Sequence, residues 1–497
     1  MQRLAAFLSA FLGVALLAGC ASVPRSGGTD DLSQIEATLA RHISVLASDE
    51  YGGRRPGTEG ELLTLRYLVR EWQAAGLVSG TNIPGSDWYQ PVELALAKPV
   101  TGTLALVEGK RRRPFEPDHA AVFTSARQAI LEDAPLLFVG RRADFGPEID
   151  LAGKVAVMLA DHPARFEQRD ALLAAGAAGV LAVVDTPGEL AALAERRRAG
   201  NYRLASDRGD EVDGLVTAEA MARALGAARY EALFDAAAEA EFAPVPLKPR
   251  IDIAATSELA DVQTHNLVAK ISGTMPEAGA VLLLAHWDHF GNCVEGSADA
   301  PAADAICNGA VDNASGLAML TELARRLRVK GPHDRDIYVL ATTAEEWGLL
   351  GARAFARDPP LPLEDVVAAF NLDTSAVAPA GGPVAIIGAG RTNLDTVVRA
   401  AIERSGRRVA DPRDAAQFLR RQDGWALLQR DVPALMVSSS FGDEEAMARF
   451  LAERYHLPED EGGDIELGGA AQDLLLHEEL VRHFSSILRW PVGRAAR

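Results

Sequence analysis

Residues 281–288 read Val-Leu-Leu-Leu-Ala-His-Trp-Asp, an apolar run that stops at a histidine and an aspartate. A short, continuous apolar run is typical of a strand that is buried on both faces. The pattern recurs downstream, because the run at 336–342 is followed by Glu345 and Glu346, and the run at 366–372 by Asp373. The sequence therefore predicts buried strands that carry acidic or imidazole side chains at their carboxyl ends.

Segments with helical spacing lie between these runs, at residues 314–328 and 348–356, and another strand is expected at 433–438. Strands that alternate with helices predict an α/β fold, with a mostly parallel sheet sandwiched by helices. Ligands of such sheets bind beyond the carboxyl ends of the strands. We therefore expect a functional site where His286, Glu345, Glu346 and Asp373 follow their strands.

His286 and Asp288 are predicted to share one face, since residues two apart in an extended chain point the same way. Asp288 can then accept the proton on the second ring nitrogen of His286 and fix its orientation. His289 is expected to face the other way and to be structural. Taken alone, a His-x-Asp sequence is common.

Asp312 lies in a Gly-Ala-Val-Asp-Asn-Ala-Ser-Gly stretch ahead of a predicted helix. It is either an ordinary N-cap residue of that helix or a ligand that bridges two metal ions. The adjacent acids Glu345 and Glu346 are either a solvated acidic turn or a pair with separate tasks. In the second interpretation one carboxylate binds metal, while the other moves a proton. Asp373 and His456 are weak signals on their own.

The order and spacing of these elements resemble the zinc aminopeptidases of peptidase family M28. The matching segments are residues 285–291, 309–316, 343–351, 371–373 and 455–460, together with 53–60 near the start. The resemblance implies a zinc-exopeptidase (phosphorylase/hydrolase-like) fold. It also implies a metallo-exopeptidase that removes N-terminal residues through a metal-bound hydroxide.

The resemblance further implies two Zn²⁺ ions per chain, with Co²⁺ or Mn²⁺ as alternatives. One ion takes His286, Asp312 and Asp373, and the other takes Asp312, Glu346 and His456. Glu345 is then the general base, and Asp288 is the partner of His286. A cis peptide between residues 312 and 313 is implied as well.

The middle of the chain, residues 116–249, contains short apolar strands at 155–159 and 180–184 and helices at 169–175 and 221–236, without a metal-type constellation. It resembles the protease-associated (PA) insert of many such enzymes. We therefore expect a metallopeptidase domain formed by residues 29–115 and 250–497, with a smaller α/β PA-like domain inserted at 116–249.

The N-terminus resembles a bacterial lipoprotein signal peptide over residues 1–20, in which Cys20 is lipidated, followed by a flexible tether at 21–28. An ordinary signal peptide with a chance cysteine is the alternative. We therefore expect an exported lipoprotein that is anchored to the outer membrane and faces the periplasm. In such a compartment, Cys293 and Cys307 either form a disulfide or remain two buried thiols.

The chain has 497 residues and a formal net charge of −19, which argues against a nucleic-acid partner. The expected partners are peptides with a free N-terminus and, through Cys20, a membrane. A carboxypeptidase-like hydrolase, a glutaminyl cyclase and a non-catalytic binding protein are the alternatives. The loop from 291 to 308 is longer than in the simplest relatives, and residues 421–424 lack the Ser-Asp-His type segment of many members.

Overall fold

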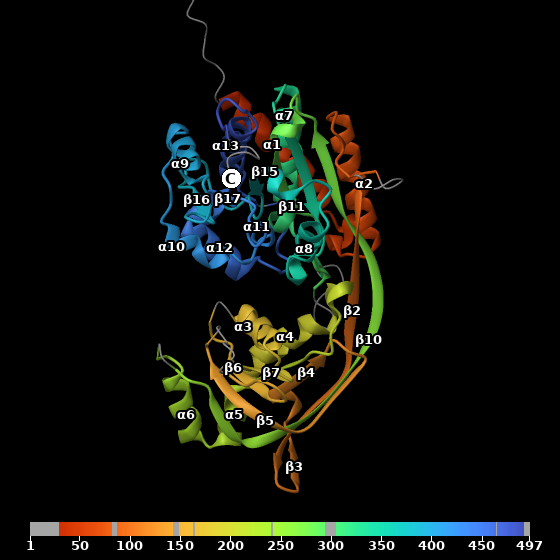
Figure 1. Cartoon of the computed structure of the whole chain (residues 1–497), viewed down its shortest axis with the longest axis vertical. Coiled ribbons are helices and arrows are strands. Elements are labelled where there is room, and N and C mark those ends of the chain that lie inside the picture. Colours follow the sequence, from red (N-terminus) through yellow and green to blue (C-terminus); the bar gives the residue numbers. More distant parts are fainter. Residues whose placement is uncertain are drawn as a thin grey trace, which may run out of the picture.

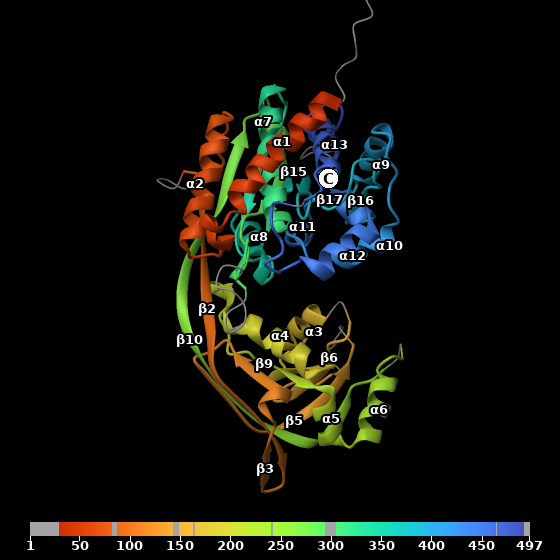
Figure 2. The same ribbon diagram turned by 180° about the vertical axis from the view of Figure 1, so that it is seen from behind.

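The computed structural model describes residues 29–81, 87–142, 149–162, 165–239, 242–293, 305–463 and 465–491. The signal peptide, the tether and Cys20 lie outside these residues, so their assignment stays a prediction. Figure 1 shows two lobes joined by two long strands, and Figure 2 shows the same arrangement from behind. In the part of the chain that is described, none of the helices combines the length and the apolar character needed to cross a bilayer.

The first lobe is built on a sheet whose central strands are parallel. Its order is β17 (Ala434–Ser438), β15 (Val366–Asn371), β11 (Ala280–His286) and β14 (Asp336–Thr342). The strands β16 (Ala385–Ile387) and β10 (Val245–Ile271) are antiparallel to their neighbours. This arrangement confirms the predicted mostly parallel sheet. It also places the carboxyl ends of β11, β14 and β15 at one edge.

Helices cover both faces of this sheet because side chains alternate along each buried strand. Leu283 of β11 belongs to a core with α1 (Thr29–Leu46), α2 (Glu59–Ala74), α7 (Gly316–Val329), α9 (Asp395–Arg404) and α13 (Gly468–Phe484). Its neighbours Leu282 and Leu284 pack in a second core with α8 (Leu350–Arg357) and α11 (Gly424–Leu428). Burial on both faces explains why these strands read as continuous apolar runs.

The second lobe consists of the elements from β4 to α6 together with parts of the two long strands, and it packs around its own apolar cores. Its strands are β4 (Ala120–Thr124), β5 (Gln128–Gly140), β6 (Val155–Leu159), β7 (Gly179–Val184), β8 (Asn201–Leu204) and β9 (Val212–Thr217). Its helices are α3 (Arg165–Ala174), α4 (Pro187–Arg198), α5 (Ala218–Leu225) and α6 (Ala227–Ala236). The single helix predicted over 221–236 is wrong, because Gly226 has a φ of +86° and separates α5 from α6.

Two long antiparallel strands, β2 (Tyr89–Glu108) and β10, run through both lobes. An ion-pair cluster adds a second connection, in which Asp207 of the second lobe lies 2.9 Å from Arg353 and 2.7 Å from Arg357, both on α8. The remaining short elements are β1 (Val78–Ser79), β3 (Arg111–Pro114), β12 (Gly291–Asn292), β13 (Ile306–Cys307), α10 (Pro412–Ala415) and α12 (Glu444–Glu453).

Candidate metal centre

The predicted site residues come together at the carboxyl edge of the first lobe's sheet. His286 is the last residue of β11, Glu345 and Glu346 lie just after β14, and Asp373 follows β15. Asp312 lies in an irregular turn at Ala310–Ser315 that leads into α7, and the bond from Asp312 to Asn313 is cis. The fifth contributing segment carries His456, which lies beyond the end of α12.

Asp312 lies between the two imidazoles and faces each with a different oxygen. Its Oδ1 is 3.2 Å from Nε2 of His286, and its Oδ2 is 3.4 Å from Nε2 of His456. Each imidazole also has a second carboxylate, since Asp373 Oδ1 is 3.6 Å from His286 Nε2 and Glu346 Oε2 is 3.0 Å from His456 Nε2. The side chains therefore form two clusters of possible metal ligands, and Asp312 belongs to both.

Zinc fits these side chains, since imidazole nitrogens and carboxylate oxygens are its ordinary ligands besides cysteine. Ligand atoms of His286, Asp312 and Glu346 lie within 4.8 Å of one another. His456 Nε2 is buried and makes no well-aligned hydrogen bond, although two carboxylates lie within ion-pair distance of it. The ring nitrogen and the carboxylate oxygens point at a common position between them. They therefore do not point at one another, which explains the missing hydrogen bond.

The charges of the cluster are mutually dependent. Burial opposes ionisation of Asp312 and Glu346, but the imidazoles hold the pKa of Asp312 well below its usual range and that of Glu346 at about 2. Burial likewise opposes a charge on His456, yet Glu346 and Asp312 raise its pKa to about 9. The carboxylates thus attract positive charge to the space between them, which divalent cations can supply in place of protons.

Glu345 and its neighbour Glu346 occupy different environments. Glu346 lies between two imidazoles, with Oε1 2.6 Å from His289 Nδ1 and Oε2 3.0 Å from His456 Nε2. Glu345 instead lines a pocket. Burial, assisted by the charges of Asp423 and Glu346, raises its pKa well above the usual range despite the opposing effect of His286. Of the two acids, Glu345 is therefore the one whose carboxyl group lines the pocket and has a raised pKa.

Asp288 supports the site differently from the prediction. Its carboxylate lies 4.0 Å from His286 Nδ1, whereas its backbone oxygen lies 3.2 Å from that nitrogen. The carboxylate accepts the backbone N–H of Glu345 at 3.0 Å and that of Glu346 at 3.4 Å. The reason is that β11 ends at His286, so the alternation of an extended chain does not continue through Asp288.

The prediction that His289 faces away from the site is wrong for the same reason, since β11 ends before this residue. Its ring does not face away from the site, because its Nδ1 contacts Glu346 and its ring lies 5.7 Å from that of His456. Two further residues have roles that the sequence did not reveal. Asp460 accepts the backbone N–H groups of Val311 and Asp312, both at 3.0 Å, and so ties the His456 loop to the Asp312 turn.

The second of these residues is Arg54, which is fully buried. Its guanidinium donates to the backbone oxygens of Trp287 at 2.9 Å, Asn308 at 2.5 Å, Gly309 at 2.9 Å and Leu46 at 2.8 Å. It thereby joins the segment after His286 to the segment before Asp312. Arg54 lies in the segment 53–60 that resembles family M28, but the sequence did not show its role or its partners.

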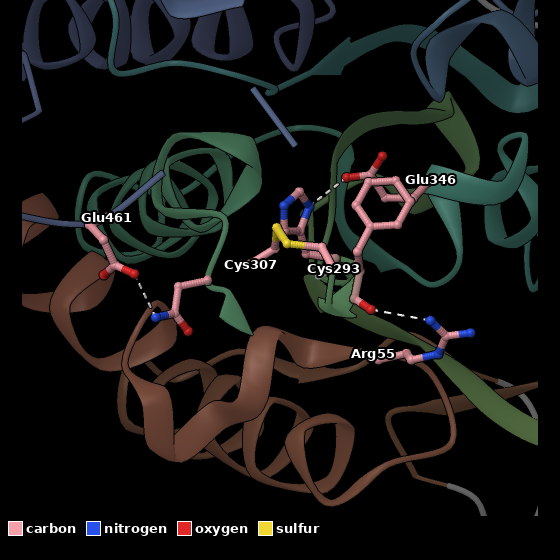
Figure 3. The surroundings of a disulfide bond; sticks show 8 residues. Arg55, Cys293, Cys307, Glu346 and Glu461 are labelled. Carbon is pink, nitrogen blue, oxygen red and sulfur yellow. Dashed lines mark hydrogen bonds and ion pairs between the residues drawn. A yellow bond between two sulfur atoms is a disulfide. The ribbon is translucent and has the colours of Figure 1, made fainter. Parts of the chain in front are cut away.

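Cys293 and Cys307 form a disulfide, with their Cα atoms 5.7 Å apart. The bond closes the hairpin of β12 and β13, and Figure 3 shows it beside Glu346 and Arg55. Gly53 requires its hydrogen here, because a Cβ would lie 2.4 Å from the backbone oxygen of Cys307. The disulfide hairpin is thus packed against the same turn that carries Arg54.

A pocket opens beside the ligand cluster, and its empty space of about 410 Å³ includes a part that is open to solvent. Its polar lining includes His286, Asp312, Glu345, Asp373 and Thr374. Its apolar lining consists of Phe418, Met436, Phe441, Met447, Phe450 and Leu451, and Arg421 and Tyr455 complete it. Arg421 lies 3.2 Å from the Tyr455 hydroxyl, so the segment at 421–424 does contribute to the site.

Comparisons with known proteins agree with this site. Residues 266–473 match the sequence model of peptidase family M28, and all five candidate ligands lie within that range. A vacuolar membrane protease of Lachancea thermotolerans is 29% identical over 147 residues, which are 30% of this chain and 13% of that protein. The chain thus spans a small part of the length of that relative.

Two solved structures share the fold at 18% sequence identity. An aminopeptidase from Aneurinibacillus sp. strain AM-1 has a TM-score of 0.58, covering 92% of this chain and 96% of its own. A zinc aminopeptidase from Bacillus subtilis has a TM-score of 0.50, covering 91% of this chain and 96% of its own. Residues 266–473, which are less than half of the chain, thus match peptidase family M28.

Proposed function

We propose that this protein is a two-zinc aminopeptidase that removes the first residue of peptides. One observation carries the proposal: Asp312 presents one oxygen to His286 and the other to His456, and each imidazole has its own second carboxylate. His286, Asp312 and Asp373 would hold one ion, and Asp312, Glu346 and His456 the other. Bound zinc supplies Lewis acidity, which polarises a scissile carbonyl and makes a water molecule easier to deprotonate.

Glu345 acts as the general base in this proposal. It lines the pocket beside His286 and Asp312, whereas Glu346 is engaged by two imidazoles. It would accept a proton from the attacking water and pass it to the leaving amine. A carboxyl group with a raised pKa suits this task, because it holds the proton between the two transfers.

The lining of the pocket supports a preference for peptides with a free amine and an apolar first side chain. With Asp312 and Asp373 assigned to the ions, a free amine would be held at the centre by one of the two ions, beside the pocket that Glu345 lines. The apolar lining offers two methionines, Met436 and Met447, and three phenylalanines, all at most 8% exposed. Burying an apolar side chain there is favourable by about 1.5–3 kcal/mol, whereas a charged one would lose its hydration.

The test is zinc stoichiometry of the purified protein together with cleavage of leucyl and glutamyl anilides. About two zinc ions per chain, and activity on the leucyl substrate that a chelator abolishes, support the proposal. N-acetyl-leucyl anilide is the matched control and should resist cleavage. One zinc ion and release of ammonia from a Gln-initiated peptide would favour a glutaminyl cyclase, while cleavage from the C-terminus would favour a carboxypeptidase.

We also propose that the protein is a lipoprotein anchored through Cys20 and that its second lobe is a PA-like domain. The signal-like residues 1–20 support the anchor. A Cys20→Ser substitution in the full chain should abolish incorporation of labelled fatty acid and release the protein from membranes. Retention of label in that variant would contradict the assignment.

A further inference from the structure

Arg55 lies at the junction of the two lobes and contacts both. Its Nε donates to the Tyr202 hydroxyl at 3.2 Å and its Nη2 to the backbone oxygen of Ala199 at 2.8 Å, both in the second lobe. Its Nη1 donates to the backbone oxygen of Phe290 at 3.2 Å, in the first lobe. Tyr202, which is 3% exposed, in turn donates to the backbone oxygen of Pro56 at 2.9 Å.

A series of ring contacts leads from this junction to the candidate ligands. The ring of Tyr202 lies 4.8 Å from that of Trp347, which follows Glu346 in the chain. Trp347 lies 5.4 Å from Phe290, and Phe290 lies 4.6 Å from the imidazole of His456. Figure 3 shows the guanidinium of Arg55 with its hydrogen bond to a backbone oxygen, which is the contact to Phe290 given above.

These contacts reach one half of the candidate centre. Phe290 packs against His456, and Trp347 is the next residue after Glu346. His456 and Glu346 are the two residues assigned to the same ion. The residues of the other half are held from within the first lobe, since His286 contacts the backbone of Asp288 and Asp373 accepts from Thr374 at 3.0 Å. The two metal positions therefore differ in their dependence on the second lobe.

We propose that Tyr202 and Arg55 are positioning residues through which the second lobe sets the zinc affinity of the Glu346–His456 position. The inference rests on the proposed two-zinc function. It follows that damage to the junction weakens one metal position and leaves the other unchanged. Changing residues that orient metal ligands lowers metal affinity by roughly 10–100-fold, so about tenfold is expected for Tyr202, which acts through an intervening ring.

The experiment measures both zinc affinities of the full chain by competition with a chromophoric chelator. Tyr202→Leu removes the ring and the hydroxyl, and Tyr202→Phe removes the hydroxyl alone. We expect the first variant to weaken one of the two affinities about tenfold and the second to weaken it less. Tyr230→Leu makes the same chemical change in α6 of the second lobe, away from the junction, and should leave both affinities unchanged.

A double-mutant cycle identifies the affected position. With Glu346→Ala, which disables that position, Tyr202→Leu should have no further effect on the remaining affinity. With Asp373→Ala, which disables the other, it should still weaken the remaining affinity about tenfold. Equal loss at both positions, or no loss at either, would overturn the inference. A wild-type protein that binds fewer than two zinc ions would overturn the proposed function as well.

Discussion

At the residue scale, the sequence predicted the location of candidate side chains well wherever they follow the end of a strand. His286, Glu345, Glu346 and Asp373 were found because parallel strands bring their carboxyl ends together. Supporting contacts made through the backbone were not predictable. Arg54 donates to four carbonyl groups, and Asp460 accepts two N–H groups. Their partners are far away in the sequence, and no local pattern records such contacts.

Glu345→Gln should separate catalysis from metal binding. The amide cannot accept a proton, so kcat should fall by about 10²–10⁴-fold. Zinc content should stay near the wild-type value, because Glu345 makes no contact with the imidazoles among the described ion pairs. The matched change Glu346→Gln should instead lower zinc content in elemental analysis. Near-normal turnover in Glu345→Gln would disprove the base assignment.

Arg54→Lys should destabilise the first lobe by about 2–4 kcal/mol in urea unfolding. The lysine keeps the positive charge but cannot reproduce four hydrogen bonds that diverge from a planar guanidinium. Arg112→Lys, which alters a half-exposed ion pair with Asp252, is the matched control and should change stability by less than about 1 kcal/mol. Equal effects of the two substitutions would argue against the role given to Arg54.

At the element scale, buried strands were predicted more accurately than the long strands that join the lobes. The limits expected for β6 and β14 agree with the structure because continuous apolar runs mark them clearly. β2 and β10 were not predicted, since their middle sections are exposed and carry little apolar alternation. The break between α5 and α6 was missed because a single glycine inside an alanine-rich helical pattern is often tolerated.

The packing of α1 against α2 should make stability depend on pH through His42. This residue is 2% exposed, and its Nδ1 lies 2.6 Å from the Tyr67 hydroxyl. Burial, with smaller effects of Arg41 and Arg325, lowers its pKa to about 4. The unfolded chain, with a histidine pKa of about 6.5, binds more protons between these values. Stability is therefore complete above pH 6.5 and falls by up to about 3 kcal/mol as the pH approaches 4.

Urea unfolding of the wild type and of His42→Gln at several pH values between 4 and 7 tests this dependence. The difference in unfolding free energy between the two proteins should change with pH over that range. Tyr67→Phe removes the hydrogen bond but keeps the titrating imidazole, so it should lower stability while retaining the wild-type slope. A pH-independent difference for His42→Gln would show that His42 does not titrate in this way.

At the scale of the whole molecule, the two lobes have separate apolar cores and a limited junction. The core of the first lobe and that of the second share no residue, and residues 258–261 of β10, between them, are exposed. Among the described residues, the junction includes the Asp207 ion pairs, the contacts of Arg55 and a small cluster around Tyr202. The lobes can therefore unfold as distinct units if their stabilities differ.

Removal of metal should reveal that difference in a calorimetric scan. A ligand that binds the folded state stabilises it by about 4 kcal/mol at a thousandfold excess over its Kd, and in the proposed centre zinc acts on the first lobe alone. Chelation should also leave the buried carboxylates of Asp312, Asp373 and Glu346 close together. The first-lobe transition should therefore move to lower temperature, while the transition of the second lobe moves much less. Limited proteolysis would identify the lobe that unfolds first. If the protein instead shows a single thermal transition that shifts as one unit, the junction couples the two lobes completely.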